Sequence, residues 1–406
     1  MDETWAGTDL GGFGLDNLPY GIAVRAGDER AGPTVVTRIG DRVLPVADVV
    51  RADRRPLLEQ PTLNAFLAAG PAVWAEVRDA LQEHLVDDRN ARELAAVDDV
   101  ELVLPVAVGD VVDFYASIEH ATNLGRILRP DAEPLLPNWR HLPVGYHGRS
   151  ASVVVSGTPV RRPSGLVAQG EGVVRRPSAQ LDLELEVGFV VGQGNHGSPI
   201  AVDAAAAHVF GVVLVNDWSA RDIQAFEYQP LGPFLGKSFA TSISAWVVPM
   251  AALDPFIVEP PVQDPPPDGG LRATKPWGLD LELEVVLDGD VVAAPNFRGT
   301  YWTFAQQLAH LTSNGALTRP GDLFASGTVS GPAPDERGSL IELTWRGRDP
   351  LVLGGGRTRT WLEDGDEVVL RGRGHRGHHH VALGDVTGVI DGSRVTDRID
   401  GSEAST

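Results

Sequence analysis

The sequence of 406 residues contains no cysteine, and this absence excludes several kinds of chemistry. Without a thiol the chain has no disulfide, no thiolate nucleophile and no cysteine-ligated zinc or iron–sulfur site. It also lacks a run of about 18 apolar residues, the length that a helix needs to cross a membrane. No Gly-x-Ser-x-Gly motif occurs, so the sequence does not support a serine hydrolase with a nucleophile elbow.

Positive charge is also scarce in this chain. It has 34 Lys and Arg against 55 Asp and Glu, which gives a formal net charge of −21. So acidic a protein repels phosphates and anionic lipids, and we expect neither nucleic acid nor a membrane as a partner. Residues 1–4 (MDET) are acidic where a signal peptide is basic, and we expect a cytoplasmic protein.

Lysine is the rarest charged residue, because only Lys237 and Lys275 occur among the 34 basic residues. A lysine that remains in so arginine-rich a chain is a candidate for a role that needs a compact, rotatable ammonium group rather than a planar guanidinium. Lys275 lies in a polar segment, and we expect no special role for it. Lys237, between Gly236 and Ser238, is a candidate for chemistry.

Among the patterns that are present, the heptad LDLELEV stands out because it occurs twice, at residues 181–187 and 279–285. Apolar and acidic residues alternate in both copies, which predicts strands with all acids on one face. The second copy leads to Asp288-Gly289, a pair typical of tight hairpin turns. We therefore predict that the second copy belongs to a meander with its acids at the surface.

The first copy has a different context, since it continues into the apolar segment GFVVG at residues 188–192. This continuation predicts a buried strand with Asp182, Glu184 and Glu186 on one face. Buried carboxylates need partners, and a divalent cation satisfies several at once. Ligation by oxygen alone favours a hard cation, Mg²⁺ or Ca²⁺.

Two further acids lie in strand contexts. Asp113 shares the face of a short strand with Tyr115, and Asp217 ends the apolar run GVVLVND. Together with Glu184 and Glu186 these acids would carry −4 against the +2 of a cation, so we expect Lys or Arg nearby to balance the site.

A helix that carries His120 is predicted directly after Tyr115. Ser117 is a suitable N-cap, and Gly125 is expected to end the helix. A lone histidine is more often structural than catalytic, but His120 follows the inward-facing Asp113 by only seven residues. It is therefore a candidate for the same site.

A second helix is predicted after Asp217, with Ser219 and Asp222 forming a capping box at its start. Arg221, Gln224 and Tyr228 then fall on one helical face. A guanidinium, an amide and a phenol on one face suit the binding of an anion or oxyanion. The same periodicity is equally compatible with an amphipathic helix at the surface.

Two other segments contain residues that could take part in catalysis or metal binding. Glu342 lies in the alternating segment SLIELTW, which predicts a strand and leaves this acid either solvated or paired with a buried cationic group. The sequence HRGHHH contains four histidines that could bind a metal, but we expect a surface loop there; they are His375, His378, His379 and His380.

The sequence also indicates how the chain is organised. Residues 1–105 combine short strands with one helix that Pro71 opens. From residue 106 onward strands dominate, and the spacing of Phe304, Leu308 and Leu311 predicts a further helix that Gly315 closes. We therefore expect two domains, residues 1–105 and 106–406.

Several long stretches resemble the fumarylacetoacetase (fumarylacetoacetate hydrolase) family. They include DFYASIEHATNLGRILRP, LLPNWRHLPVGYHGRSASVVVSGTPVRRP, LDLELEVGFVVG and VNDWSARDIQAFEYQPLGPFLGKSFATSISAWVVPM. The resemblance implies a mostly β protein, in which a small SH3-like barrel precedes a larger mixed β-sandwich or roll, and it implies a homodimer. It also implies metal-dependent hydrolysis of a carbon–carbon bond in fumarylacetoacetate, the last step of tyrosine and phenylalanine degradation.

The resemblance further implies roles for individual residues. Asp113, Glu184, Glu186 and Asp217 would be the metal ligands, without Asp182, and a second cation would lie near Lys237 and Thr241. The catalytic residues would be His120, oriented by Glu342, together with Arg221, Gln224 and Lys237. The substrate contacts would be Tyr115, Arg129, Tyr146, Arg221, Gln224, Tyr228 and Thr328.

Two other functions remain open from the sequence alone. A relative that acts on a different keto acid, such as an acylpyruvase, a decarboxylase or a hydratase, would keep the four acids without needing His120, Arg129 and Tyr146 together. A non-catalytic binding protein on the same fold is the other alternative, although the complete set of catalytic residue types argues against it.

Overall fold

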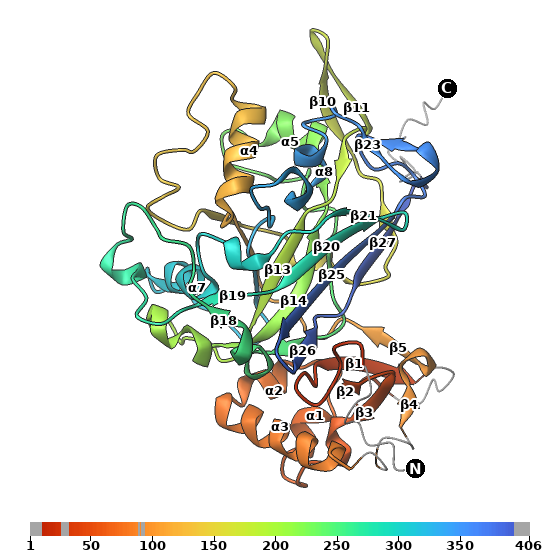
Figure 1. The fold of residues 1–406 in the computed structure, drawn as a ribbon, viewed down its shortest axis with the longest axis vertical. Helices are drawn as coiled ribbons and strands as arrows, with labels where there is room; N and C mark the ends of the chain where they lie inside the picture. The colour runs from red at the N-terminus through yellow and green to blue at the C-terminus, as the bar shows by residue number, and fades with distance from the viewer. Residues whose placement is uncertain (1–9, 26–31, 88–89, 91–93, 394–406) are drawn as a thin grey trace, which may run out of the picture.

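The computed structural model describes residues 10–25, 32–87, 90 and 94–393, and it consists of a smaller N-terminal part beside a larger one (Figure 1). Both parts are built mainly of strands. The predicted fold class is confirmed, with a small N-terminal β domain followed by a larger two-sheet domain. No helix in the described part of the chain combines the length and the apolar character needed to cross a membrane.

The N-terminal part contains an antiparallel five-stranded sheet in the order β4-β3-β2-β1-β5. Its strands are β1 (Tyr20–Arg25), β2 (Thr34–Ile39), β3 (Arg42–Pro45), β4 (Ala95–Ala96) and β5 (Val100–Val103). Three helices accompany the sheet, namely α1 (Arg55–Leu58), α2 (Asn64–Ala68) and α3 (Pro71–Leu85). As predicted, Pro71 is the first residue of α3, and Val77, Leu81 and Leu85 form its buried face.

The larger part is organised around an eight-stranded sheet, whose main order is β7-β6-β22-β13-β14-β16-β8. Its strands are β6 (Val111–Phe114), β7 (Gly145–His147), β8 (Val153–Val155), β13 (Leu185–Val191), β14 (Val209–Asp217), β16 (Thr241–Ile243), β17 (Val248–Pro249) and β22 (Leu323–Ala325). β13 and β14 are buried along their whole length, which explains why their sequences are almost continuously apolar.

A second sheet of six strands packs on one face of the first, in the main order β21-β20-β25-β27-β9. Its strands are β9 (Val160–Arg161), β20 (Glu282–Leu287), β21 (Asp290–Ala293), β25 (Glu367–Arg376), β26 (His379–Ala382) and β27 (Val386–Asp391). The apolar residues of both LDLELEV copies lie in the core between the two sheets. The copies thus meet the same core from opposite sides.

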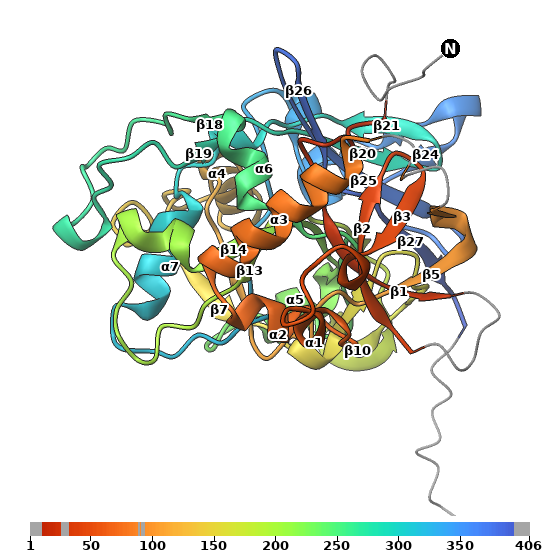
Figure 2. The ribbon, with the colours of Figure 1, turned by 90° about the horizontal axis from the view of Figure 1, so that it is seen from below.

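The opposite face of the eight-stranded sheet is covered in part by the N-terminal domain. Val190 of β13 and Phe210 of β14 share a second core with Tyr20 and Phe66, and the rings of Tyr20 and Phe210 lie 5.4 Å apart. Viewed from below, α3 crosses in front of the strands of the larger part (Figure 2). β13 and β14 are therefore buried on both faces, and a polar side chain on either face has no access to bulk water unless a cavity supplies it.

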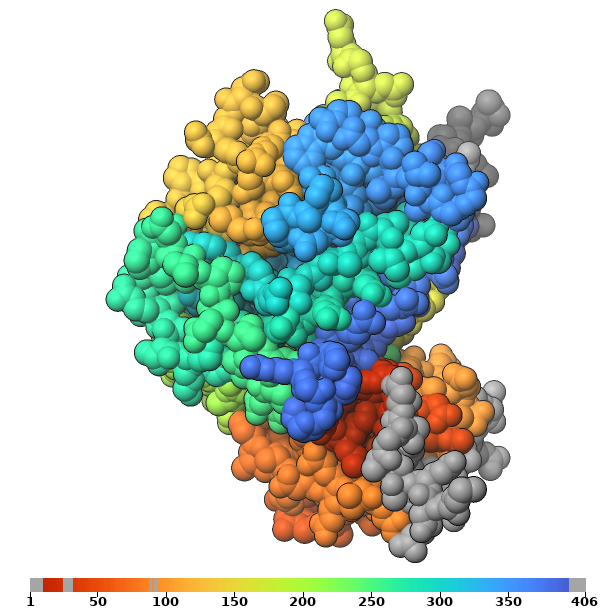
Figure 3. Space-filling view, viewed as in Figure 1, coloured from red at the N-terminus to blue at the C-terminus, as the bar shows by residue number. Residues whose placement is uncertain are grey.

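Short helices and small strands connect these sheets. The helices are α4 (Ile118–Leu128), α5 (Arg221–Glu227), α6 (Met250–Leu253), α7 (Phe304–Thr312) and α8 (Leu340–Leu343). The two-stranded pairs are β10 (Ser164–Gln169) with β11 (Gly172–Pro177), β12 (Leu181–Asp182) with β15 (Ser219–Ala220), β18 (Ile257–Val258) with β19 (Gly278–Leu279), and β23 (Leu351–Val352) with β24 (Thr358–Arg359). The β10–β11 hairpin projects from the surface of the larger part (Figure 3).

Two predicted helix boundaries are wrong. Gly125 does not end α4 but lies inside it, at a position where a side chain would collide with the carbonyl oxygen of Pro134. Ser219 does not cap α5, since it belongs to β15 and Ala220 is the N-cap. At Ser219 the pairing of β15 with β12, which local sequence does not reveal, decides the conformation.

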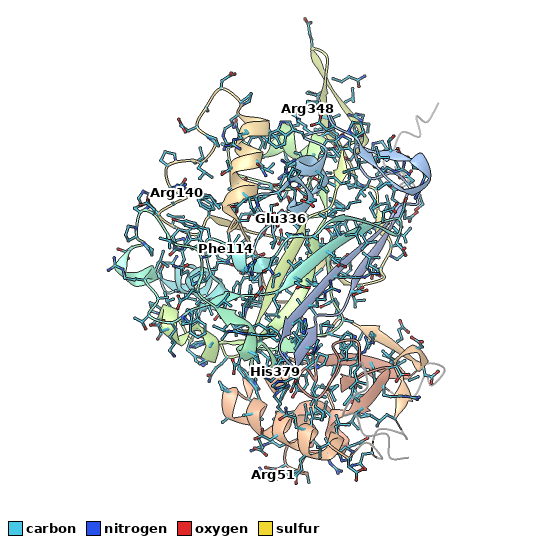
Figure 4. The ribbon with its side chains drawn as sticks, viewed as in Figure 1. Arg51, Phe114, Arg140, Glu336, Arg348 and His379 are labelled. Atoms are coloured by element: carbon cyan, nitrogen blue, oxygen red, sulfur yellow. The ribbon has the colours of Figure 1, made fainter. Side chains whose placement is uncertain are left out.

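The histidine cluster is also not a loop. His375 and His380 are cross-strand partners in the β25–β26 hairpin, and their rings stack 4.2 Å apart. His379, labelled in Figure 4, lies where this hairpin meets the N-terminal domain, with its Nδ1 atom 3.2 Å from Oδ2 of Asp16. The four histidines are thus part of a regular hairpin rather than the loop that we expected.

Candidate functional site

Four carboxylates from separate segments meet at one end of the eight-stranded sheet. Asp113 lies in β6, Glu186 near the start of β13 and Asp217 at the end of β14, while Glu184 precedes β13 and forms a backbone bridge with Ser339. β13 runs antiparallel to its neighbours, so its start lies beside the ends of the other two strands. One oxygen of each acid lies within 4.8 Å of the others, and all four are buried.

The chemistry of this cluster fits a divalent cation. Oδ1 of Asp113 and both carboxylate oxygens of Glu186 are buried without a hydrogen-bond partner. Burial, followed by the charges of the neighbouring acids, raises the pKa values of Asp113 and Glu186 well above their ordinary range. Buried oxygens that no protein group donates to are costly, and a hard cation takes carboxylate ligands of this kind. The cluster could therefore hold Mg²⁺ or Ca²⁺.

Two buried cationic side chains partly balance the cluster, as the charge count predicted. Lys237 donates to Glu184 and to Oδ2 of Asp217, the latter at 2.7 Å, and Nη2 of Arg221 lies 2.6 Å from Oε1 of Glu184. Burial opposes ionisation of Glu184, but Arg221 and Lys237 outweigh it and lower the pKa of this acid. Four carboxylates and two cations sum to −2, so one divalent cation would balance these six groups.

A histidine–carboxylate pair lies beside the cluster. Ser117 caps α4 by accepting a hydrogen bond from the backbone N–H of His120. Nδ1 of His120 lies 2.6 Å from Oε2 of Glu342, and its Nε2 lies 3.9 Å from Oε1 of Glu184. One ring nitrogen is thus held by a carboxylate while the other is directed toward the four acids.

The secondary structure at Glu342 differs from the sequence prediction, whereas its burial beside His120 matches one of the two alternatives left open. This residue lies in the short helix α8 and not in a strand, and its side chain is fully buried. Besides His120, it accepts hydrogen bonds from Ser339 at 2.7 Å, Ser330 at 2.9 Å and Asn123 at 2.9 Å. Burial opposes ionisation of Glu342, but the charge and hydrogen bond of His120 lower its pKa.

Sequence reasoning missed Asn123, Ser330 and Ser339. Asn123 follows His120 by three residues, so helical spacing could have placed both side chains on one face. Ser339 precedes Glu342 by three residues, so the Ser-x-x-Glu spacing at the start of a helix could have indicated this contact. Ser330 offered no such signal, because it reaches Glu342 from outside α8.

A cavity of about 460 Å³ opens next to the cluster and the His120–Glu342 pair. Asp113, Glu184, His120 and Lys237 form part of its wall. All predicted substrate contacts also line it, namely Tyr115, Arg129, Tyr146, Arg221, Gln224, Tyr228 and Thr328. The helical face predicted on α5 is therefore turned toward a cavity and not toward solvent, and Nη1 of Arg221 donates to Oε1 of Gln224 at 3.1 Å.

A second cavity of about 360 Å³ also borders the cluster. Asp113, Tyr146 and Lys237 line both cavities, whereas Glu186 and Thr241 line only the second. Thr241 donates to Oδ1 of Asp217 at 3.2 Å. The carboxylates are thus accessible from two sides.

Two residues that the sequence analysis discussed lie outside the cluster. Lys275, the other lysine, is exposed, and its ammonium lies 5.7 Å from the centre of the Trp277 ring. Asp182, the first acid of the first heptad, is buried but binds Nε of Arg221 at 2.8 Å instead of joining the four acids. The ligand set implied by the resemblance omits Asp182, and it stays a prediction.

Comparison with known proteins gives a consistent result. Residues 16–105 match the model described as fumarylacetoacetase N-terminal, and residues 111–388 match that described as fumarylacetoacetate hydrolase C-terminal. The chain is 45% identical over 403 residues to the fumarylacetoacetase of Homo sapiens, covering 93% of this chain and 96% of that protein. It is 44% identical over 407 residues to that of Arabidopsis thaliana, covering 93% and 95%.

Solved structures show the same fold at much lower identity. A fumarylacetoacetate hydrolase from Exiguobacterium antarcticum superimposes with a TM-score of 0.56 at 16% identity, covering 92% of this chain and 99% of that one. A protein from Mycobacterium smegmatis described as a putative HpcE gives a TM-score of 0.54 at 21% identity, with the same coverage. Together with the sequence matches over nearly its whole length, these likenesses show that the chain belongs to the fumarylacetoacetase family.

Proposed function

We propose that this protein hydrolyses the carbon–carbon bond of 4-fumarylacetoacetate to fumarate and acetoacetate, the last step of tyrosine and phenylalanine degradation. The observation that carries this proposal is that a single cavity is lined by two acids of the carboxylate cluster, by the histidine of the histidine–carboxylate pair and by two buried cationic donors; they are Asp113, Glu184, His120, Arg221 and Lys237. Those are the three components that such a hydrolysis requires, and they arise from segments far apart in the sequence.

Asp113, Glu184, Glu186 and Asp217 are the proposed ligands of a divalent cation, Mg²⁺ or Ca²⁺. When bound, such an ion polarises a carbonyl group and helps to orient a diketo substrate. A second cation near Lys237 and Thr241 remains a prediction; within the described residues no other group of three acidic or histidine side chains has metal-binding geometry.

His120 is the proposed general base. Glu342 holds Nδ1, so Nε2 is the nitrogen that can accept a proton from water as that water attacks the substrate carbonyl. The ring sits at the first turn of α4 and is almost completely buried, which fixes its direction. A base positioned in this way contributes roughly 10²–10⁴-fold to the rate.

The remaining chemistry needs positive charge and hydrogen-bond donors. The tetrahedral alkoxide formed by attack requires donors, and we assign this role to Arg221, Gln224 and Lys237. Collapse of the alkoxide breaks the carbon–carbon bond and expels acetoacetate as a carbanion, which the ammonium of Lys237 can stabilise because it is compact and already lies at the cavity wall. The carbanion then takes up a proton, which balances the proton that His120 removes from water. The proposed substrate contacts are Tyr115, Arg129, Tyr146, Tyr228 and Thr328.

The decisive experiment is an assay of the purified protein with fumarylacetoacetate, before and after treatment with a chelator. We expect turnover that the chelator abolishes and that Mg²⁺ or Ca²⁺ restores. An acylpyruvate and other keto acids, tested in parallel, distinguish a relative with different specificity. Absence of turnover with every substrate, at full cation occupancy, would support a non-catalytic binding protein instead.

Three further features belong to this proposal. A domain boundary near residue 105 is supported by the separate N-terminal sheet. A homodimer is supported by apolar side chains that are exposed near the cavities, with Leu231 at 96%, Phe234 at 56% and Leu235 at 47% exposure. A cytoplasmic location agrees with the absence of cysteine.

A further inference from the structure

Asp182 is a fully buried acid that the proposed mechanism does not use. It is the first acid of the first heptad, with 0% exposure, and it is not one of the four clustered carboxylates. It accepts four hydrogen bonds: from the backbone N–H groups of Leu183 at 2.8 Å, Leu340 at 2.7 Å and Ile341 at 3.1 Å, and from Nε of Arg221 at 2.8 Å. A buried carboxylate with so complete a set of donors is fixed in direction.

These contacts join two segments that are far apart in the sequence. Arg221 opens α5 and lines the substrate cavity, while Leu340 and Ile341 open α8, the helix that carries Glu342. The carboxylate of Asp182 bridges the starts of both helices. It thereby links the element that holds a proposed oxyanion donor to the element that holds the partner of His120.

The guanidinium of Arg221 has three carboxyl or amide partners, one for each nitrogen. Nε binds Asp182, Nη1 binds Gln224 at 3.1 Å and Nη2 binds Glu184 at 2.6 Å. A planar group held at all three nitrogens cannot rotate. Of the three partners, Asp182 is the only one that does not line the cavity.

We propose that Asp182 is a positioning residue, which fixes the plane of Arg221 toward the substrate by tying it to the start of α8. This inference rests on the proposed function. Asp182 lines neither cavity and is not one of the four clustered acids, so it would act through Arg221. Misplacement of a catalytic group by about 1 Å can reduce the rate by 10²-fold, which sets the size of the effect.

The variant Asp182→Asn tests this role with little change in volume. All four partners of Asp182 are donors, and the NH₂ group of asparagine would face at least one of them, donor against donor. We expect kcat to fall by about 10²-fold with little change in KM, because an interaction that acts in the transition state is lost. Cation binding by calorimetry should keep its wild-type stoichiometry, which shows that the cluster is intact.

A double-mutant cycle with Arg221→Lys separates positioning from a merely structural role. Lysine keeps the charge but lacks Nε, so Asp182 no longer has a guanidinium to orient. The loss caused by Asp182→Asn should then shrink from about 10²-fold to within about threefold, because the two residues act as one unit. If the full loss persists in the Arg221→Lys background, Asp182 does not act through Arg221 and the inference is overturned.

The second heptad supplies the matched control. Asp280 occupies the same position as Asp182, but its side chain is 36% exposed and accepts a hydrogen bond from Asn296 at 2.8 Å. Asp280→Asn should change kcat less than about twofold, as expected for an exposed substitution. An equal loss in both variants would overturn the inference.

Two further outcomes are informative. If Asp182→Asn does not fold by circular dichroism, Asp182→Ser, which is smaller and keeps an oxygen acceptor, enters the same cycle with the same expectations. The wild-type assay is read first: an inactive wild type overturns the proposed function and this inference with it. An active wild type with additive effects in the cycle overturns only the role of Asp182.

Discussion

The two LDLELEV copies allow the same seven residues to be compared in two environments of one molecule. Both copies are interrupted, so that β12 and β19 each end before the longer strands β13 and β20 begin. Both direct their leucines into the same core. The local backbone and the apolar face are therefore alike, and the difference lies on the acidic face.

The acidic face is buried in the first copy and largely exposed to solvent in the second. Glu184 and Glu186 are 4% and 0% exposed and lie among the carboxylates of Asp113 and Asp217. In the second copy the side chains of Glu282 and Glu284 are 56% and 22% exposed, and both pair with Arg373 across the sheet, at 3.0 and 3.1 Å. Surface pairs of this type contribute little to stability, roughly 0–1 kcal/mol. The comparison teaches that an identical strand sequence becomes a candidate metal site only where other segments enclose its acids.

The strongest test of this comparison replaces glutamates in each copy. Glu184→Ala or Glu186→Ala should abolish cation-dependent activity, because each removes a proposed ligand from the cluster. Glu282→Ala or Glu284→Ala should leave activity within about twofold of wild type, since substitutions on solvated faces usually change stability by no more than roughly 0.5 kcal/mol. Steady-state kinetics at saturating cation measures both; similar losses in the two copies would show that context does not separate them.

A second test asks whether His120 is a base beside the four clustered acids or one of the cation ligands. His120→Ala should lower kcat by about 10²-fold or more, because it removes the proposed base. Cation affinity measured by calorimetry should stay close to that of wild type, since His120 is not one of the four clustered acids. The control is His380→Ala, in the distant β25–β26 hairpin, which should leave both kcat and cation affinity unchanged. Loss of cation binding with His120→Ala would make this residue a ligand instead.

The two lysines offer a second comparison between a buried and an exposed residue of the same type. Lys237 binds Glu184 and Asp217 in a buried site, whereas Lys275 is exposed. Lys237→Arg keeps the charge but places a larger planar group there, and we expect a loss on the order of 10²-fold in kcat, the size of one oxyanion donor. Circular dichroism should show an intact fold, and Lys275→Arg should behave like wild type. Near-normal turnover in Lys237→Arg would leave Arg221 as the catalytic cation.

The smallest expected effect concerns pH and stability. The pKa values of Asp113 and Glu186 are raised, so the folded, cation-free protein binds more protons than the unfolded chain. The stability of the folded protein therefore falls as pH rises above the ordinary pKa values of these groups, 3.8 and 4.5, toward the raised values. A cation replaces those protons, and at 100 times its Kd it adds roughly 2.7 kcal/mol. The rise in Tm on adding cation should therefore be larger at pH 8 than at pH 6.

The control for this measurement again comes from the second copy. Glu282→Gln with Glu284→Gln should show the same cation-dependent rise in Tm as wild type at both pH values, because these acids lie outside the cluster. Glu186→Gln should reduce the rise at pH 8. A cation effect that is independent of pH would contradict the assignment of protons to the cluster.

Much of the fold and the site could be predicted from the sequence, and the errors occur where contacts outside the local sequence decide the structure. The helix that begins at Pro71, the cap at Ser117 and the turn at Asp288-Gly289 follow from local rules, and the structure confirms them. The predictions that Gly125 ends α4 and that Glu342 lies in a strand were wrong. At Glu342 the contacts of Leu340 and Ile341 with the distant Asp182 outweigh local propensity, and at Gly125 the close approach of Pro134 accounts for a glycine inside the helix.

The residue types available for a site can be read directly from the chain: no thiol, two lysines, a repeated acidic strand, and family motifs that cover nearly its whole length. Which acids form a cluster depends on the fold, because Asp113, Glu184, Glu186 and Asp217 meet through strand order and not through spacing. The fold also decides that Asp182 binds Arg221 and that Asp280, its counterpart in the second copy, stays near solvent. The physical reason is that burial and charge depend on neighbours in space, which an identical heptad cannot encode.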